Sequence, residues 1–361
     1  MWVLKELMKT LHKTLVVLTL AGSLMFSSDN TSGGSLLQDL GAKGAGIAGA
    51  GVSMAGDVTF LKYNPAALAS LKNPQLSLFY FNGGEIGSNF GSLTYGQKFG
   101  PGVIALAVSY LNGGQMELNF SSGVTQTVIS QQDIIGDLSY ALELYKDIEI
   151  GVSVKALAST LFGSLNAQTL CGDAGVQVKN ILIENLNFGA AVLNVALNSG
   201  NGIKYLNTSE LLPTNVAAGV SYSMAVDNKI GVLAGVDAVS NLNDNSQYLL
   251  FGTEVTYEDY ALRAGLPLFS KLDTLFAVGL GFKINEFTFD YSMTFGKTLA
   301  ATHKISVGML FGEIKPPEVK PLPVQDKGPT IQDKGPSEYK IPAPKTTVPA
   351  KKPGVVKKEI K

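Results

Sequence analysis

The sequence predicts an all-β protein: a transmembrane antiparallel β-barrel of about fourteen strands with a short N-terminal plug and a disordered C-terminal tail. Apolar and polar residues alternate with a period of two through most of the chain, which indicates strands with two different faces. The connections between the expected strands alternate in length, which is typical of outer-membrane barrels. A secretory signal at the N-terminus places the protein outside the cytoplasm.

The period-two pattern is clearest at 286–295, EFTFDYSMTF. There Phe289 and Tyr291 share one face, and Asp290 and Ser292 share the other. The pattern recurs at 148–156, 173–179 and 303–311. In a soluble sandwich the apolar face would form the core. In a membrane barrel it would contact lipid, so that Phe289, Tyr291 and Val307 point outward while Asp290 and Ser306 line the interior.

Turn lengths favour the membrane barrel over the sandwich. The expected strands begin near Gln75, Asn89, Gly102, Ile134, Asp147, Cys171, Leu186, Pro213, Ile230, Ser246, Tyr260, Asp273, Glu286 and His303. Short connections at 100–101, 146–147, 180–185, 226–229, 258–259 and 285 alternate with long ones at 112–133, 159–170 and 197–212. An even strand number with short turns at one end predicts an outer-membrane barrel with both termini in the periplasm.

The N-terminus has the composition of a signal peptide, assigned to residues 1–28. Lys5, Lys9 and Lys13 precede an uncharged apolar run at 15–26, with cleavage expected near Ser27 or Ser28. The run is too short and wrongly flanked for a membrane-spanning helix. The single cysteine excludes an internal disulfide.

The C-terminal tail, residues 313–361, has a different composition from the barrel region at 74–312. It holds ten of the fifteen prolines, eleven lysines and six acidic residues, for a charge of about +5. Such a segment has too little apolar surface to fold alone. Its charge predicts contact with acidic peptidoglycan or an acidic periplasmic partner, weakened by salt.

The segment 29–73 is expected to form the plug or hatch. Residues 40–69 are rich in Gly and Ala, which permits close packing of backbone against a barrel wall. Asn64 is a preferred helix N-cap and Pro65 suits the first helical position, so a helical turn is predicted from there to Leu71. The alternative is a cap in a simple connecting loop.

This segment also resembles the N-terminal signature of the PorV/PorQ-like outer-membrane barrels, which are relatives of the FadL-type long-chain fatty acid transporters. The plug motif is carried by Asp57, Asn64, Pro65, Ala66 and Leu68, with Ala67 where the family usually has Gly. Further landmarks follow in the family's order at 212–214, 262–265, 289–291 and 302–306. Where the family usually has Arg this chain has Lys43 and Lys304, and Leu266 replaces Tyr.

The resemblance implies a role in the outer membrane, and three roles stay open. A PorV-like barrel would hold or pass secreted proteins in a type IX-like secretion system. A FadL-like barrel would carry hydrophobic small molecules such as fatty acids, with the plug as gate. A structural barrel would only anchor other envelope components. The partners expected are therefore outer-membrane lipid and, depending on the role, secreted cargo, secretion-system proteins or hydrophobic small molecules.

No pattern in the sequence predicts an enzyme, a cofactor, a metal site or a nucleic-acid partner. Gly44, Gly46 and Gly49 fit a dinucleotide fingerprint only in spacing, because no parallel strand–helix–strand unit surrounds them. No catalytic residue or metal ligand set is expected. Arg263, the only arginine, is expected inside the lumen, either paired with Asp290 or Glu254 or with the plug, or solvated.

Overall fold

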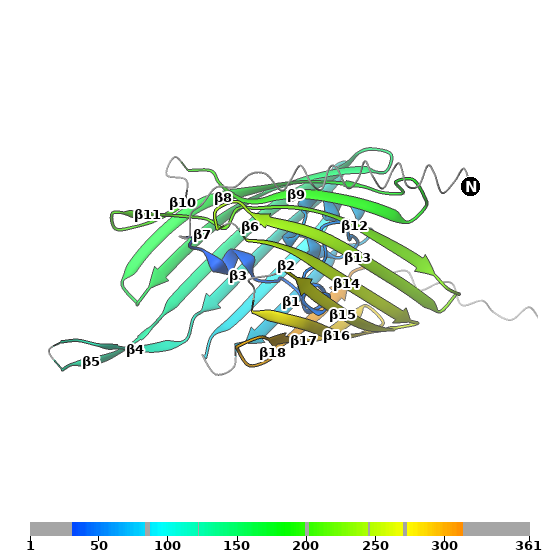
Figure 1. Ribbon diagram of the computed structural model, residues 1–361. Coiled ribbons are helices and arrows are strands. Elements are labelled where there is room, and N and C mark those ends of the chain that lie inside the picture. Colours follow the sequence, from blue (N-terminus) through cyan, green and yellow to red (C-terminus); the bar gives the residue numbers. More distant parts are fainter. Residues whose placement is uncertain are drawn as a thin grey trace, which may run out of the picture. The chain divides into compact units, whose positions relative to one another are not determined.

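The computed structural model describes residues 31–83, 87–121, 123–198, 202–244, 246–269 and 273–312. The signal peptide and the tail lie outside the described residues. Fourteen of the described strands form one closed antiparallel barrel, as predicted (Figure 1). They are β1 (Gln75–Asn82), β2 (Asn89–Phe99), β3 (Gly102–Asn112), β6 (Gln131–Tyr145), β7 (Ile148–Leu161), β8 (Leu165–Val178), β9 (Leu186–Ala196), β12 (Asn215–Ala225), β13 (Ile230–Asn241), β14 (Gln247–Tyr257), β15 (Tyr260–Leu268), β16 (Thr274–Ile284), β17 (Phe287–Gly296) and β18 (Thr302–Leu310).

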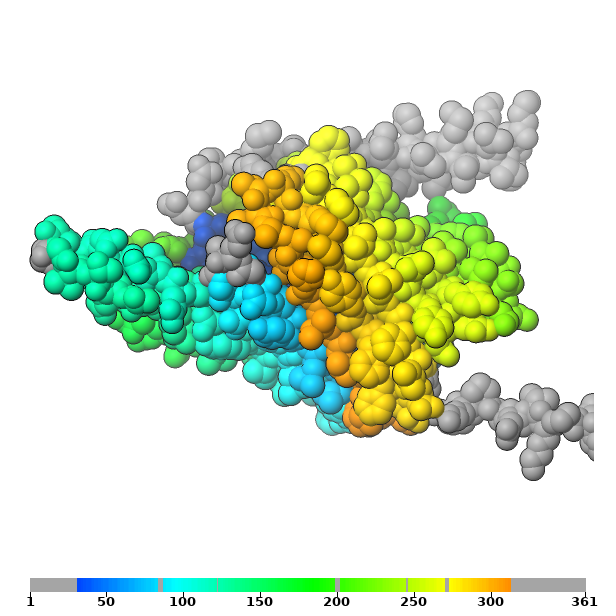
Figure 2. Space-filling view, turned by 90° about the horizontal axis from the view of Figure 1, so that it is seen from below, coloured from blue at the N-terminus to red at the C-terminus, as the bar shows by residue number. Residues whose placement is uncertain are grey.

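The barrel closes between its first and last strands. β1 pairs with β18 over its whole length, from Gln75↔Leu310 to Asn82↔His303. Figure 2 shows the orange atoms of β18 beside the blue-to-cyan atoms of the first strands. The backbone N–H of Phe311 donates to the carbonyl of Pro74 at 2.9 Å, just beyond the last strand pair. Closure leaves no free sheet edge. Strands in a bilayer require this, because lipid offers no hydrogen-bond partner to unpaired backbone groups.

The predicted faces of the strands are confirmed. Ile305 and Val307 are 50% and 40% exposed, whereas Ser306 between them is 6% exposed and points inward. On β17, Phe289 stacks on the neighbouring Phe282 with ring centroids 4.9 Å apart. Asp290, on the other face, binds Arg263 inside the barrel. The period-two pattern therefore separates an apolar outer surface from the interior.

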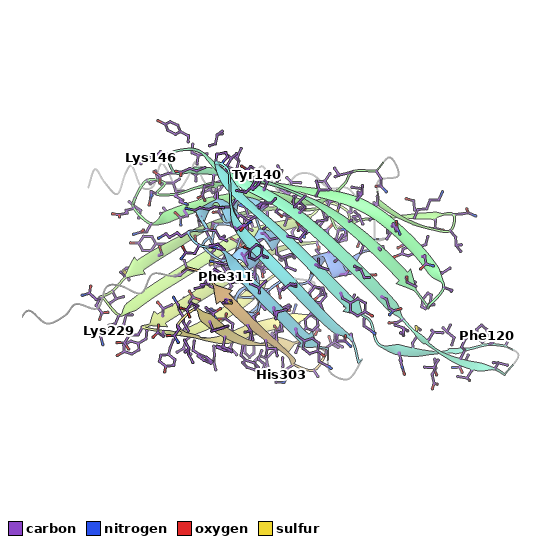
Figure 3. All side chains as sticks on the ribbon, turned by 180° about the vertical axis from the view of Figure 1, so that it is seen from behind. Phe120, Tyr140, Lys146, Lys229, His303 and Phe311 are labelled. Carbon is purple, nitrogen blue, oxygen red and sulfur yellow. The ribbon has the colours of Figure 1, made fainter. Side chains whose placement is uncertain are left out.

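The two ends of the barrel differ in their connections, as Figure 3 shows with Lys146 and Lys229 at one end and Phe120 and His303 at the other. We call these the short-turn end and the long-connection end. Two of the long connections contain hairpins that the sequence did not indicate: β4 (Gln115–Asn119) with β5 (Thr125–Ile129), and β10 (Gly202–Tyr205) with β11 (Thr208–Leu211).

The long loop predicted at 159–170 is wrong. β7 continues to Leu161 and β8 begins at Leu165, so only three residues connect them. The turn carries two successive positive φ angles, 51° at Phe162 and 69° at Gly163. Tight hairpins need such angles, and Asn-Gly or Asp-Gly usually supplies them. A phenylalanine at the first position hid the turn in the sequence.

Four short helical elements precede the barrel: η2 (Gly34–Leu37), α2 (Ala42–Gly46), η3 (Val58–Lys62) and η4 (Pro65–Ser70). They belong to the N-terminal segment, which we define as residues 31–74. None of the helices in the described chain is long and apolar enough to cross a membrane.

Candidate functional site inside the barrel

The N-terminal segment enters the barrel from the long-connection end. Thr31 forms a parallel bridge with Leu211 of β11, and the N–H of Ser32 donates to the Leu211 carbonyl at 2.8 Å. The segment leaves at the short-turn end, where β1 begins at Gln75. Gly312 follows β18 at that same end. The described ends of the chain, Thr31 and Gly312, thus lie at opposite ends of the barrel, while the termini themselves lie outside the described residues and their compartment stays a prediction.

Asn64 is the centre of the predicted plug motif. Its side-chain oxygen accepts a hydrogen bond from the N–H of Ala66 at 3.0 Å, and η4 follows from Pro65, so the predicted helical turn is confirmed. Its amide nitrogen donates to the carbonyls of Val52 at 2.8 Å and Val176 at 3.0 Å. Asn64 is fully buried, so these bonds satisfy a side chain that would otherwise be costly to bury.

The other motif residues pack directly on the barrel wall. Pro65, Ala66 and Leu68 are all buried in η4. A Cβ on Gly151 of β7 would lie 2.4 Å from the Pro65 carbonyl carbon, and one on Gly175 of β8 would lie 1.9 Å from Asn64 Oδ1. Glycine is therefore required where the segment touches these strands. The same close approach recurs at Gly189 and Gly265, against Val52 and Ile47.

Asp57 has a role within the N-terminal segment itself. It is the N-cap of η3, and its Oδ1 accepts from the N–H of Thr59 at 2.9 Å and from the Thr59 hydroxyl at 2.7 Å. Lys43 Nζ lies 3.9 Å from Asp57 Oδ2 and 5.6 Å from the centre of the Phe60 ring. The motif carboxylate therefore stabilises the fold of the segment.

Polar groups of the wall bind the backbone of the N-terminal segment. Asp237 Oδ2 accepts from the N–H of Val52 at 2.9 Å, and Gln177 donates to the Val52 carbonyl at 3.1 Å. Ser306 accepts from the N–H of Ala42 at 2.7 Å. Backbone groups at membrane depth need such partners, and here the barrel supplies them. No local pattern in the sequence predicts these pairings, because they join residues far apart in the chain.

Asp39 ties the segment to β18. Lys304 Nζ lies 2.8 Å from Asp39 Oδ2, and the Tyr63 hydroxyl donates to Asp39 Oδ1 at 2.8 Å. Lys304 stands where the PorV/PorQ resemblance would place an arginine, and it makes a carboxylate contact.

A second group of buried charges lies beside β7 and β8. Lys155 Nζ is 2.6 Å from Asp173 Oδ2 and donates to Asn194 Oδ1 at 2.9 Å. Lys62 of η3 donates to the Leu36 carbonyl. The segment thus carries one of its own charges into the barrel at this point.

The structure brings Arg263, Glu254 and Asp290 together. Arg263 Nε lies 2.5 Å from Glu254 Oε2, and its Nη1 lies 2.6 Å from Asp290 Oδ1. The Arg263 side chain is only 5% exposed. Gly281 leaves room for the pair, because a Cβ there would lie 2.6 Å from Asp290 Oδ1. One guanidinium therefore joins β14, β15 and β17 from inside the barrel.

We expect Arg263→Gln to lower the stability of the barrel by about 3–5 kcal/mol, because it leaves two buried carboxylates without their cation. Samples are heated to a series of temperatures and run on a gel without boiling. The measurement is the temperature at which the compact, folded band is lost. The matched control is Lys229→Gln, which breaks the exposed pair with Glu258 and should cost less than about 1 kcal/mol. Equal shifts for both variants would contradict a structural role for Arg263.

The inner face is not uniformly polar, which modifies the prediction of a polar lining. On β1, β2 and β3 the inward side chains include Phe79, Phe81, Phe90 and Val103, all buried. The rings of Phe81 and Phe90 stack with centroids 5.6 Å apart. We call this cluster the apolar inner wall. It packs against residues of the N-terminal segment, namely Leu40, Val58, Leu61, Leu68 and Leu71.

A polar hollow of about 400 Å³ lies at the short-turn end, beneath the N-terminal segment. Its lining includes Lys43, Asp57, Gln75, Ser77, Thr288 and Asp290. Among the described residues, no cluster of three or more His, Cys, Asp or Glu side chains could hold a metal ion. The interior therefore combines a polar vestibule, a fixed N-terminal segment and an apolar sector of wall.

Comparison with solved structures supports the fold. A scan against protein-family models and a search of curated proteins both find no match. Among solved structures, the toluene transporter TodX of Pseudomonas putida superposes with a TM-score of 0.55 at 13% identity, covering 78% of this chain and 98% of that one. The monoaromatic hydrocarbon channel CymD gives 0.50 at 13% identity, covering 76% and 98%.

A TodX variant described as a monoaromatic hydrocarbon channel gives a TM-score of 0.51 at 14% identity, covering 75% of this chain and 98% of that one. The comparisons therefore show the fold alone, and they do not show the PorV/PorQ branch. The chain is a closed antiparallel barrel of fourteen described strands that shares its fold with TodX and CymD.

Proposed function

We propose that the protein is an outer-membrane transporter of hydrophobic small molecules, gated by its N-terminal segment. The observation that carries the proposal is the apolar inner wall, in which Phe79, Phe81 and Phe90 face the segment rather than the bilayer. The interior of a water-filled porin is polar. An apolar sector inside the barrel favours solutes that leave water readily.

The outer surface supports a place in the outer membrane. Its exposed side chains include Leu78, Leu106, Val152 and Leu280, each at least half exposed. Outward aromatic pairs stand toward both ends, with Phe276 on Phe295 toward the long-connection end and Phe282 on Phe289 toward the short-turn end. Apolar bands flanked by aromatic side chains are characteristic of barrels in lipid. In this proposal the long-connection end faces the cell exterior.

The shared fold supports the class of solute. TodX is described as a toluene transporter and CymD as a monoaromatic hydrocarbon channel. This chain covers nearly the whole of both proteins, so the likeness extends over the complete barrel. By analogy, the favoured solutes are hydrocarbons or other hydrophobic small molecules.

Uptake by whole cells tests the proposal. Cells that lack their own hydrophobic-solute transporters would express the protein and be given toluene or a fluorescent long-chain fatty acid. We expect uptake of the hydrophobic solute to exceed that of cells carrying the empty expression vector. Uptake of a polar sugar of similar mass should not increase. Uptake that does not depend on the protein would overturn the proposal.

The N-terminal segment covers the apolar inner wall, so transport along this wall requires the segment to move. Deleting residues 44–52 removes the glycine-rich stretch together with the Val52 contacts to Asp237 and Gln177. We expect the deletion to make reconstituted barrels permeable to small solutes, measured by dye release from liposomes. Deleting 115–129, the β4–β5 hairpin outside the barrel, is the control and should not change permeability. If liposomes that contain the variant lacking residues 44–52 release no dye, the N-terminal segment is not the barrier to permeation.

A secretion role of the PorV type is a second candidate, favoured by one observation. The β4–β5 hairpin extends from the long-connection end and exposes Met116, Phe120 and Val124 (Figure 1). Such a surface would suit a secreted protein held at the barrel mouth. Deletion of 115–129 should then release the cargo while hydrophobic uptake continues. Cargo that stays bound after the deletion would remove this argument.

A further inference from the structure

The outer wall of the barrel carries a groove between β6, β7 and β8. The hollow has a volume of about 540 Å³ and its lining includes Ile134, Gly136, Ala156, Ala158, Gln168 and Leu170. These positions lie on the outward face, where Ile134 is 54% and Leu170 is 49% exposed. The groove is therefore separate from the candidate site inside the barrel.

Strand register explains why the surface is hollow there. Gly136 of β6 lies opposite Ala156 of β7, and Ile134 lies opposite Ala158. Three small residues thus form a continuous floor over two neighbouring strands. The outward residues one step toward the short-turn end are Leu138 and Val154, each at least half exposed. The floor is recessed below the surrounding surface because the neighbouring outward side chains are larger than those of Gly136, Ala156 and Ala158.

The groove is bounded at one end by amide side chains. Just beyond β9 the pairing with β8 continues by one residue, because the Leu197 N–H donates to the Leu170 carbonyl at 2.9 Å. This brings Asn198 to the groove, where it is one of the lining residues together with Gln168. Both amides lie toward the long-connection end of the barrel. The groove therefore has an apolar floor and a polar upper rim.

We infer that the groove binds one acyl chain of an outer-leaflet lipid, with the lipid's polar head at Gln168 and Asn198. The groove is continuous with the apolar outer band of the barrel, so lipid is the partner that reaches it. An acyl chain along the floor buries the apolar surface of Ala156 and Leu170. The Gln168 amide can donate to an ester carbonyl of a lipid head, and Asn198 Oδ1 can accept from a head-group hydroxyl, since Asn198 Nδ2 already donates to the Gly202 carbonyl at 2.9 Å. The inference rests on the proposed place in the outer membrane.

Photo-cross-linking of the full-length barrel in liposomes tests the inference. The probe is a phospholipid with a photoreactive group on its acyl chain, and cross-linked peptides are identified by mass spectrometry. We expect several-fold more cross-linking on the peptides that contain Gly136 and Ala156 than on the outward face of β15 around Ala264. Equal cross-linking around the barrel would overturn the inference, because it would show only bulk lipid contact.

Filling the groove provides the second arm. A Cβ on Gly136 would have no heavy atom within 4 Å, so Gly136→Leu fits the fold and occupies the floor. We expect this variant to reduce cross-linking at Ala156 several-fold, whereas Ala264→Leu on β15 leaves it unchanged. Unchanged cross-linking with Gly136→Leu would show that no lipid chain is held there. A complete lack of cross-linking on every outward strand would instead contradict the proposed membrane location, on which the inference depends.

Discussion

Replacing Gly151 with leucine is expected to displace the N-terminal segment from the barrel wall. A Cβ on Gly151 would lie 2.4 Å from the Pro65 carbonyl carbon and 2.5 Å from the Ala66 nitrogen. Both obstacles are backbone atoms of η4, so no side-chain rotation can relieve the overlap. Forcing extra atoms into such a contact typically costs about 1–3 kcal/mol and sometimes more. Gly265→Leu should act in the same way through Ile47 and Ala48.

Proteolysis measures this displacement directly. A segment that leaves the wall exposes its backbone, so the Gly151→Leu barrel should be cleaved within residues 31–74 under conditions that leave the wild type intact. Dye release from liposomes should rise in parallel. Gly136→Leu is the control, because the same substitution on the outward face of a neighbouring strand meets no atom. Equal resistance of the two variants would mean that the inner glycines do not hold the segment.

Substituting Tyr291 with arginine should impair insertion and folding. Tyr291 lies on the outer face near the middle of β17, and its hydroxyl is 2.6 Å from His303 Nδ1 on the neighbouring strand. Arginine on the lipid face near the bilayer midplane costs roughly 2–4 kcal/mol. We expect a clear fall in the fraction of protein that migrates as the compact, heat-modifiable form after refolding into lipid.

The control needs an inward site on β17 that has space. Ser292 shares the inward face but is fully buried, and it lies opposite Gly279, where α2 packs closely through Gly46. An arginine would not fit there, so Ser292 is not the mild site that its polarity suggests. Thr288 lines the polar hollow, and Thr288→Arg should fold almost normally. Similar losses for Tyr291→Arg and Thr288→Arg would contradict the assignment of the two faces.

Much of the barrel could be predicted because its signals are local. Period-two alternation at 286–295 assigns Phe289 and Tyr291 to the outer face without knowledge of any partner strand, and the same pattern predicts about fourteen strands, the number in the closed barrel. The Asn64-Pro65 cap also acts within a few residues, so its turn could be predicted. The missed turn at Phe162 lacked the usual residue for a positive φ, and local sequence offered no other cue.

The strand faces, the number of barrel strands and the helical turn at Asn64 follow from local sequence, because each depends on neighbouring residues in the chain. The path of the N-terminal segment, the inner glycines that it touches and the partners of Arg263 emerge only from tertiary contacts. Those contacts join residues such as Pro65 and Gly151 that are distant in sequence. Barrel closure sets which inward faces meet. A glycine in a strand can therefore be recognised as a packing requirement only when the neighbouring atom that occupies the place of a Cβ is known.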